Sequence, residues 1–532
     1  AVKSRHSNFL FLGPSNKQAP SQRPAGSMSE NYQKTFDRLC LSMRETALLR
    51  STFSLLGWDE QTGMPPAAAD YRGEQMAHLA GIIHRRRTDS QLGDWLEQLA
   101  ESPLCADPHS VQGTIVRESK RQFERHRKLP EALVMELTRT AVQGQHDWQQ
   151  ARAKNDFSIF MPSLTKLVGL KQQEADAIGY SDCRYDALLD EYEPWETTAR
   201  VKNILEGLRE ELVPLLQEIK NSDTTIETGC LNRNFPVEKQ RRVGKEVAEN
   251  IGFDFQQGRL DTTVHPFCTE IGPYDTRITT RYDENFLPTS LFGVLHESGH
   301  AIYEQGLCKE WYGLPAGETI SLGIHESQSR IWENQIGRSR AFWTGYFPRL
   351  QSVFPEALRD ISLESFYHAI NTVTPSPIRV EADEITYNLH ILIRFELEQL
   401  LLNDDVAIQD LPEAWDDKYE SYLGIRPQTA SEGVLQDIHW SGGAFGYFPT
   451  YALGNLYSAQ FFAKCETDLG DLTTQVANGH FDPFREWLHE NIHQHGQCYS
   501  AGELVERVTG EPLTHRYLID YLRTKASEIY GL

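Results

Sequence analysis

One short segment, His296-Glu297-Ser298-Gly299-His300, has the residue types and the spacing that metal-assisted hydrolysis requires. An α-helix places residues four apart on the same face, so the two histidines can bind one metal ion together. Glu297 lies about 100° further round such a helix. From there its carboxylate can take a proton from water at the metal. The spacing therefore predicts a hydrolytic metal centre.

The flanking residues predict a helix over about residues 286–306. Pro288 suits the first turn, apolar residues lead into the motif, and Gly306 can end the helix. Gly299 in the helix interior costs about 1 kcal/mol relative to Ala. Close packing or a functional site would explain that cost.

A second pentapeptide, residues 489–493, repeats the same pattern with His489 and His493. Phe484, Trp487 and Leu488 form a helical apolar stripe around it. We therefore interpret these two histidines as polar flanks of a packed amphipathic helix and not as metal ligands.

A hydrolytic zinc site generally takes three protein ligands and keeps one position for water. The best third candidate is Glu326, which begins another helix-like stretch after a loop that contains Gly313 and Pro315. His325 is a rival ligand on chemical grounds, and an ordinary solvated helix residue is the alternative interpretation of Glu326. Spacing alone leaves this choice open.

The chain resembles the carboxypeptidase Taq family of zinc metallocarboxypeptidases in six blocks. They are His265-Pro266-Phe267, Asp275-Thr276-Arg277-Ile278-Thr279, His296 to His300, His325-Glu326-Ser327-Gln328, Ile378-Arg379-Val380-Glu381-Ala382-Asp383 and Gly433-Val434-Leu435-Gln436-Asp437-Ile438-His439-Trp440. The similarity runs from about residue 31 to the C-terminus. The resemblance implies that His296, His300 and Glu326 bind Zn²⁺ and that Glu297 is the catalytic base. It also implies a mainly α, two-lobed fold with a deep central groove and a small β-sheet near the site, and often a homodimer.

A carboxypeptidase must bind the terminal carboxylate, and arginine suits this task because its planar fork donates two hydrogen bonds and stays charged. Arg379 is the first candidate and Arg426 the second. The structural alternative pairs Arg379 with Glu381 or Asp383 in a salt bridge. Family resemblance favours substrate binding by Arg379.

Peptide hydrolysis also develops negative charge on the scissile carbonyl oxygen, which a second electrophile can stabilise. His439 and Tyr447 lie in a glycine-rich segment that resembles the histidine and tyrosine pair of angiotensin-converting enzyme and oligopeptidase relatives. Tyr451 is a nearby alternative. We expect His265 to support the wall of the site and Cys268 to be a buried thiol.

The composition fits one large helical protein. Helices are expected at about 31–60, 66–87, 107–127, 130–154, 159–178, 196–221, 286–306, 384–403 and 513–528, and strands at 262–267 and 275–282. No flexible linker divides the chain, so residues 30–532 are predicted to form a single catalytic domain. Residues 1–29 contain basic residues and serines but no acidic residue, as in a mitochondrial or plastid leader or a disordered tail.

The formal charge of −23 argues against nucleic acid and anionic membranes as partners. An acidic groove would favour cationic peptides. No apolar run reaches the roughly 20 residues that span a bilayer. Eight dispersed cysteines indicate reduced thiols and an intracellular compartment, an organelle or the cytoplasm.

The predicted activity is zinc-dependent removal of single residues from peptide C-termini. Co²⁺ or Mn²⁺ are alternative ions for the same ligands. Two other functions remain open: a zinc endo-oligopeptidase, in which a carboxylate clamp is irrelevant, and a non-catalytic helical binding protein with a structural metal.

Overall fold

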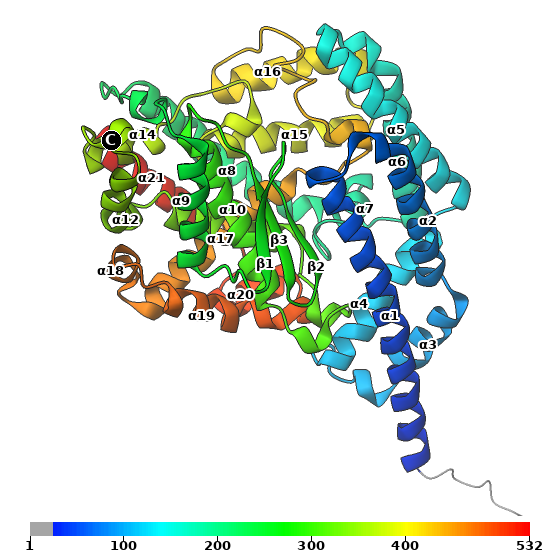
Figure 1. Cartoon of the computed structure of the whole chain (residues 1–532). Helices are drawn as coiled ribbons and strands as arrows, with labels where there is room; N and C mark the ends of the chain where they lie inside the picture. Colours follow the sequence, from blue (N-terminus) through cyan, green and yellow to red (C-terminus); the bar gives the residue numbers. More distant parts are fainter. Residues whose placement is uncertain (1–24) are drawn as a thin grey trace, which may run out of the picture.

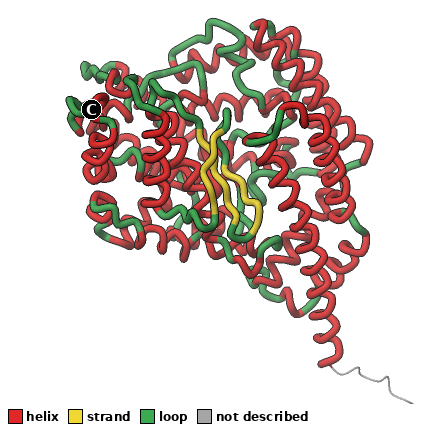
Figure 2. The backbone as a smooth tube through the Cα atoms, in the orientation of Figure 1, coloured by secondary structure: helices red, strands yellow, loops and turns green. Residues whose placement is uncertain are grey.

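The computed structural model describes residues 25–532, and most of them are helical (Figures 1 and 2). The elements in chain order are α1 (Ala25–Thr62), α2 (Ala69–Arg87), α3 (Ser90–Ala100), α4 (Val111–Lys128), α5 (Glu131–Lys154), α6 (Met161–Ile178), α7 (Arg184–Leu189), α8 (Thr198–Lys220), α9 (Val237–Ile251), β1 (Gly258–Thr262), β2 (Cys268–Gly272), β3 (Asp275–Thr280), α10 (Leu287–Gly306), α11 (Leu322–Arg330), α12 (Arg340–Val353), α13 (Pro355–Leu358), α14 (Leu363–Ile370), α15 (Thr386–Leu402), α16 (Leu411–Leu423), α17 (Pro449–Leu469), α18 (Leu472–Ala477), α19 (Asp482–Asn491), α20 (Ala501–Thr509) and α21 (Arg516–Tyr530).

Every helix predicted from apolar spacing has a counterpart, and the mainly α fold class is confirmed. The predicted leader falls largely on residues 1–24, which lie outside the described residues. Helix α1 begins at Ala25, within the range assigned to the leader. Between residues 25 and 532, no helix is long and apolar enough to cross a membrane.

The only sheet in residues 25–532 has three strands in the order β1-β3-β2, with β1 parallel and β2 antiparallel to β3. It lies near the middle of the view in Figure 1, beside α10. The predicted strand at 262–267 is wrong in position, because residues 263–267 connect β1 to β2. Pro266 has no N–H to donate to a ladder, which explains why this segment stays outside the sheet.

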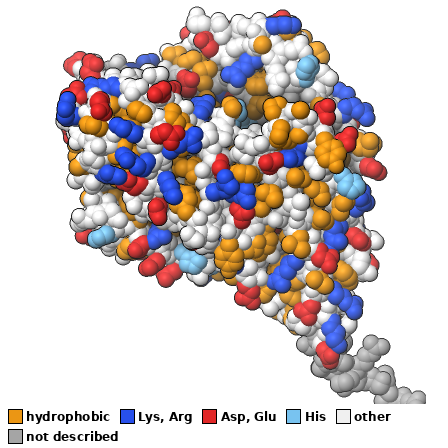
Figure 3. All heavy atoms as spheres, in the orientation of Figure 1, with side chains coloured by type: hydrophobic (Ala, Val, Ile, Leu, Met, Phe, Trp, Pro, Cys, Tyr) orange, Lys and Arg blue, Asp and Glu red, His pale blue; other side chains and the backbone are white. Residues whose placement is uncertain are grey.

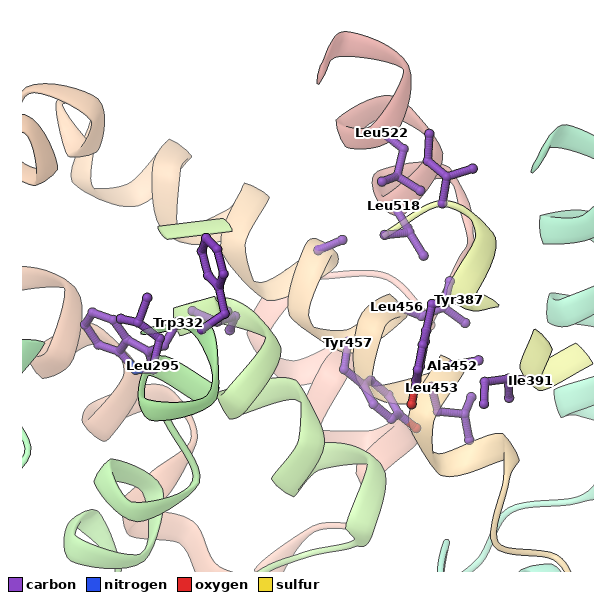
Figure 4. Close-up of a cluster of buried hydrophobic side chains, with 14 of the residues drawn as sticks. Leu295, Trp332, Tyr387, Ile391, Ala452, Leu453, Leu456, Tyr457, Leu518 and Leu522 are labelled. Carbon is purple, nitrogen blue, oxygen red and sulfur yellow. The ribbon is translucent and has the colours of Figure 1, made fainter. Parts of the chain in front are cut away.

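Helix α17 is central to the main hydrophobic core. Leu453, Leu456 and Tyr457 have no exposed surface, and α17 contacts α11, α15, α20 and α21. Figure 4 shows these side chains in one buried cluster with Leu518 of α21 and Trp332, which follows α11. The core therefore fixes α11 and α15 relative to one another, and these two helices carry residues of the site described below.

A second, smaller core joins the N-terminal helices α1, α3 and α4 through Phe36, Leu39, Leu96 and Phe123. A polar cavity of about 160 Å³ is lined by residues of α1, β2 and α10. On the face drawn in Figure 3, basic and acidic side chains are interspersed.

Candidate metal centre and substrate site

Three side chains from two helices converge into a group that can hold a metal ion. His296 and His300 lie on α10 and Glu326 on α11, and their ligand atoms all fall within 4.8 Å of one another. The Oε2 atom of Glu326 is 3.6 Å from Nε2 of His296 and 3.3 Å from Nε2 of His300. Two imidazole nitrogens and one carboxylate oxygen form a donor set that suits a hydrolytic metal ion with an open position.

The other nitrogen of each histidine is already engaged. Nδ1 of His296 lies 2.8 Å from Oε2 of Glu333, and Nδ1 of His300 lies 3.0 Å from the carbonyl oxygen of His325. Both partners accept a hydrogen bond, so each Nδ1 donates its proton away from the group and each Nε2 is the nitrogen that faces Glu326. Outer contacts of this kind fix the tautomer and the ring orientation of metal ligands.

Hydrogen bonds also fix both carboxylate oxygens of Glu326. Its Oε1 atom accepts a 2.7 Å bond from Nε of Arg330, and its Oε2 atom accepts a 2.9 Å bond from the hydroxyl of Ser329. Helix α17 lies so close that a Cβ added to Gly454 would be 2.5 Å from Cγ of Glu326. Arg330 also donates to Glu333, at 3.0 Å. One guanidinium therefore joins a ligand to the outer contact of His296.

The two histidines of this cluster have pKa values shifted in opposite directions. Burial alone would lower the pKa of His296, but the carboxylates of Glu326 and Glu333 outweigh burial and raise it to about 9. Burial lowers the pKa of His300 to about 3. The negative charge of Glu326 and Glu333 thus favours positive charge at His296.

Glu297 is placed differently from the three ligand residues. Its side chain is buried, and burial raises the pKa of its carboxyl to about 7. Among residues 25–532 its carboxylate has no hydrogen-bond partner, in contrast to Glu326 and Glu333. A buried carboxylate that no neighbour engages is suited to proton transfer near neutral pH.

His325, the rival ligand, points elsewhere. Its Nε2 atom lies 2.8 Å from Oε1 of Glu304, and its contribution to the metal group is the backbone carbonyl that accepts from His300. The second pentapeptide is interrupted, because α19 ends at Asn491 and His493 starts a separate turn. The buried His493 contacts Gln328 of α11 instead, with Nε2 2.9 Å from Oε1.

Arg379 is buried and pairs with a carboxylate that sequence reasoning did not consider. Its Nε atom donates to Asp437 at 2.9 Å, and Arg394 donates to the other oxygen of Asp437 at 2.6 Å. The structural alternative named Glu381 or Asp383 as partner of Arg379, but Asp383 instead accepts from backbone N–H groups at the start of α15. Two guanidinium groups against one carboxylate leave a net positive charge in a buried position, where it acts strongly on an anion.

Arg426 lies in a different environment. Its guanidinium contacts Glu413, Asp417 and Glu420 of α16, at 2.6, 2.9 and 3.1 Å. None of these partners belongs to the metal group. These contacts give Arg426 a local role at the end of α16.

His439 and Tyr447 lie close together, with ring centroids 5.4 Å apart. Nε2 of His439 is 3.4 Å from the hydroxyl of Tyr451, whose ring packs edge-on against that of Tyr447 with centroids 5.3 Å apart. Burial lowers the pKa of His439 to about 4, so the imidazole is neutral at pH 7. Burial raises the pKa of Tyr447, and the Glu326 carboxylate acts in the same direction.

Two residues of the predicted site lie around the start of β2. His265 is exposed in the connection between β1 and β2. Cys268 is the first residue of β2, and burial raises the pKa of its thiol well above the ordinary value, with Glu297 and Glu304 acting in the same direction. The thiol is therefore protonated, but Cys268 is half-buried and not fully buried as expected.

Several residues of the site were missed by sequence reasoning. Arg330 and Glu333 follow Glu326 by four and seven residues, a helical spacing that would have placed them on its face. Asp437 lies in one of the six blocks, but nothing local shows that it faces Arg379.

The HExxH helix and a downstream helix that supplies an acidic ligand define this protein as a helical metallopeptidase. The family model described as carboxypeptidase Taq (M32) metallopeptidase matches residues 38–526, and the chain belongs to this family of metallocarboxypeptidases.

Similar proteins cover nearly the whole chain. The thermostable carboxypeptidase 1 of Thermus thermophilus is 46% identical over 509 residues, which are 94% of this chain and 99% of that protein. A crystal structure of an M32 carboxypeptidase from Deinococcus radiodurans has a TM-score of 0.91 and 39% identity, and covers 94% of this chain and 100% of that one. Metallocarboxypeptidase 1 of Trypanosoma cruzi has a TM-score of 0.89 and 34% identity, with 93% and 99% covered.

Proposed function

We propose that this metallocarboxypeptidase uses Zn²⁺ held by His296, His300 and Glu326, with Glu297 as the catalytic base. The convergence of the three ligand side chains, each fixed by an outer contact, carries the proposal. When bound, zinc supplies a Lewis acid that acidifies water and polarises a carbonyl. Co²⁺ and Mn²⁺ are alternative occupants of the same donor set.

Glu297 accepts a proton from the attacking water and returns it to the nitrogen of the departing residue. The hydroxyl of Tyr447 donates to the developing oxyanion, and the neutral His439 orients the tyrosine pair through Tyr451. Removal of an oxyanion donor costs about 3 to 4 kcal/mol in well-studied hydrolases, which sets the scale expected for Tyr447.

Arg379 binds the terminal carboxylate of the substrate. Asp437 holds its Nε atom, and Arg394 on the same carboxylate keeps the surrounding charge positive. This arrangement orients the guanidinium and leaves an attractive field for an anion. The preferred substrates are peptides with a free C-terminus, and the catalytic unit comprises residues 30–532, as a homodimer.

The test compares free-acid peptides with their C-terminal amides, with and without a chelator. Chelation should abolish hydrolysis, and Glu297→Gln should keep the metal but lose at least a hundredfold in kcat. Arg379→Lys should lower kcat/KM for free-acid peptides about tenfold, since it loses a charged, forked hydrogen bond.

Arg426→Lys is the matched control, because this arginine contacts only α16 carboxylates, and it should leave kcat/KM within about twofold. Equal cleavage of acids and amides would identify an endo-oligopeptidase. Stoichiometric metal without hydrolysis of any peptide would identify a structural metal site.

A further inference from the structure

Glu398 of α15 is a buried carboxylate that the proposed chemistry does not use. Its side chain has no exposed surface. It accepts hydrogen bonds from the hydroxyl of Tyr185 at 2.7 Å, the indole Nε1 of Trp440 at 2.7 Å and the backbone N–H of Gly446 at 3.1 Å. Burial of a carboxylate is costly unless hydrogen bonds compensate it, so this position has a definite structural purpose.

Two of these three donors belong to the segment that carries His439 and Tyr447. Trp440 directly follows His439, and Gly446 directly precedes Tyr447. Oε1 of Glu398 holds Trp440 and Oε2 holds Gly446. One carboxylate therefore fixes the residue next to each of the two proposed catalytic side chains.

The segment has little regular structure of its own to keep its shape. After a short 3-10 turn, Gly443 and Gly446 adopt left-handed backbone conformations, with φ of 77° and 88°. Gly446 also packs against α7, because an added Cβ would lie 2.7 Å from the carbonyl carbon of Leu188. Segments of this kind are positioned by side-chain anchors instead of backbone ladders.

The third donor to Glu398 belongs to the neighbouring helix α7. Tyr185 lies on α7, and Tyr192, which follows α7, packs edge-on against the ring of Tyr447 with centroids 5.2 Å apart. Trp440 in turn stacks on Phe445 with an interplanar angle of 8°. The carboxylate thus joins α7, α15 and both ends of the catalytic segment.

We propose that Glu398 is a positioning residue, which sets the placement of His439 and Tyr447 by bridging Trp440 and Gly446. The inference rests on the proposed roles of His439 and Tyr447. Glu398 acts on kcat through the placement of these two side chains, and not through contact with substrate, metal or Arg379.

The test is a double-mutant cycle between Glu398→Gln and Tyr447→Phe, measured as kcat and KM on a free-acid peptide. Glutamine keeps one acceptor oxygen but replaces the other with an NH₂ group, so it breaks one arm of the bridge. Glu398→Gln should lower kcat about tenfold and change KM less than twofold. In the Tyr447→Phe background the same change should cost less than twofold, because residues that act together are not additive.

Trp440→Phe removes the indole donor from the other end of the same bond and keeps an aromatic ring opposite Phe445. Trp440→Phe should lower kcat as much as Glu398→Gln does. If Glu398→Gln does not fold, Trp440→Phe takes its place in the cycle with Tyr447→Phe. Glu118→Gln is the matched control, since Glu118 is only 3% exposed and also accepts an indole N–H, from Trp195 at 3.2 Å. It should leave kcat within twofold.

Movement of the segment can be read independently of activity by ¹⁹F spectra of protein labelled with 5-fluorotryptophan, in which Glu398→Gln should shift the Trp440 signal. Equal losses of kcat in both backgrounds, or an equal loss in Glu118→Gln, would overturn the positioning role. If Glu398→Gln keeps the parental kcat while Tyr447→Phe is slow, the positioning role of Glu398 is refuted and the proposed role of Tyr447 stands. Parental kcat in Tyr447→Phe would instead refute the proposed role of Tyr447.

Discussion

Replacement of Glu333 tests the metal centre through a residue that does not bind the metal. Its Oε2 atom lies 2.8 Å from Nδ1 of His296, and its carboxylate also accepts from Arg330 at 3.0 Å. Glu333→Gln removes the negative charge and can present an NH₂ group to Nδ1, which favours the wrong tautomer. Loss of such an outer contact typically weakens metal binding by 10- to 100-fold, or about 1.4 to 2.7 kcal/mol.

The assay is competition between the protein and a chelator of known affinity, with the metal content measured after equilibration. We expect the Kd to rise about tenfold in Glu333→Gln and about a hundredfold in Glu333→Ala. At saturating metal, kcat should recover most of its parental value, because Glu297 is unchanged.

The chain offers a closely matched control in Glu304→Gln. Glu304 makes a contact of the same length, 2.8 Å, with Nε2 of His325, which does not belong to the metal group. This variant should bind metal within about twofold of the parent, because an outer contact acts through the ligand that it orients and the imidazole of His325 is not a ligand. Unchanged affinity in Glu333→Gln would refute the role of this outer contact on His296. Weak binding in Glu304→Gln would instead indicate that His325 is a ligand.

Three further substitutions probe packing and pH dependence. Gly454→Ala places a methyl group against Glu326 and should abolish metal binding, whereas Gly169→Ala, with nothing within 4 Å, should raise the urea midpoint through a gain of up to about 1 kcal/mol. Burial raises the pKa of Glu193 from 4.5 to about 8, so the stability linked to this group is full below pH 4.5 and is lost as the pH rises toward 8. Glu193→Gln cannot ionise, and its urea midpoint should fall less than that of the parent between pH 5 and pH 8; an equal fall would contradict the raised pKa.

The parts of the structure that local sequence dictates were predictable. Apolar spacing located the long helices, and the four-residue interval of His296 and His300 placed both on one face of α10. The third ligand needed the family resemblance, because spacing did not separate Glu326 from His325. The structure separates them through side-chain direction, since His325 turns toward Glu304.

The parts that depend on contacts distant in sequence were not predictable. Nothing near Arg379 shows that its partner is Asp437, which belongs to a different block of the sequence. The strand expected at 262–267 failed for a related reason, because pairing with β3 and not local propensity determines which residues of this region are extended. Glu398 gives no sequence signal at all, since a glutamate in an apolar helix resembles any solvated residue.

The residues that hold α11 in place come late in the chain, so they affect when the protein can bind its metal during synthesis. The helix that carries Glu326 packs against Gly454 of α17, and Gln328 on the same helix contacts His493. On the ribosome, a nascent chain that has already exposed His296, His300 and Glu326 still lacks the segments that hold the carboxylate in place. We therefore expect tight metal uptake to follow release of almost the full-length chain, and ribosome-bound chains that end before α17 to exchange their metal freely.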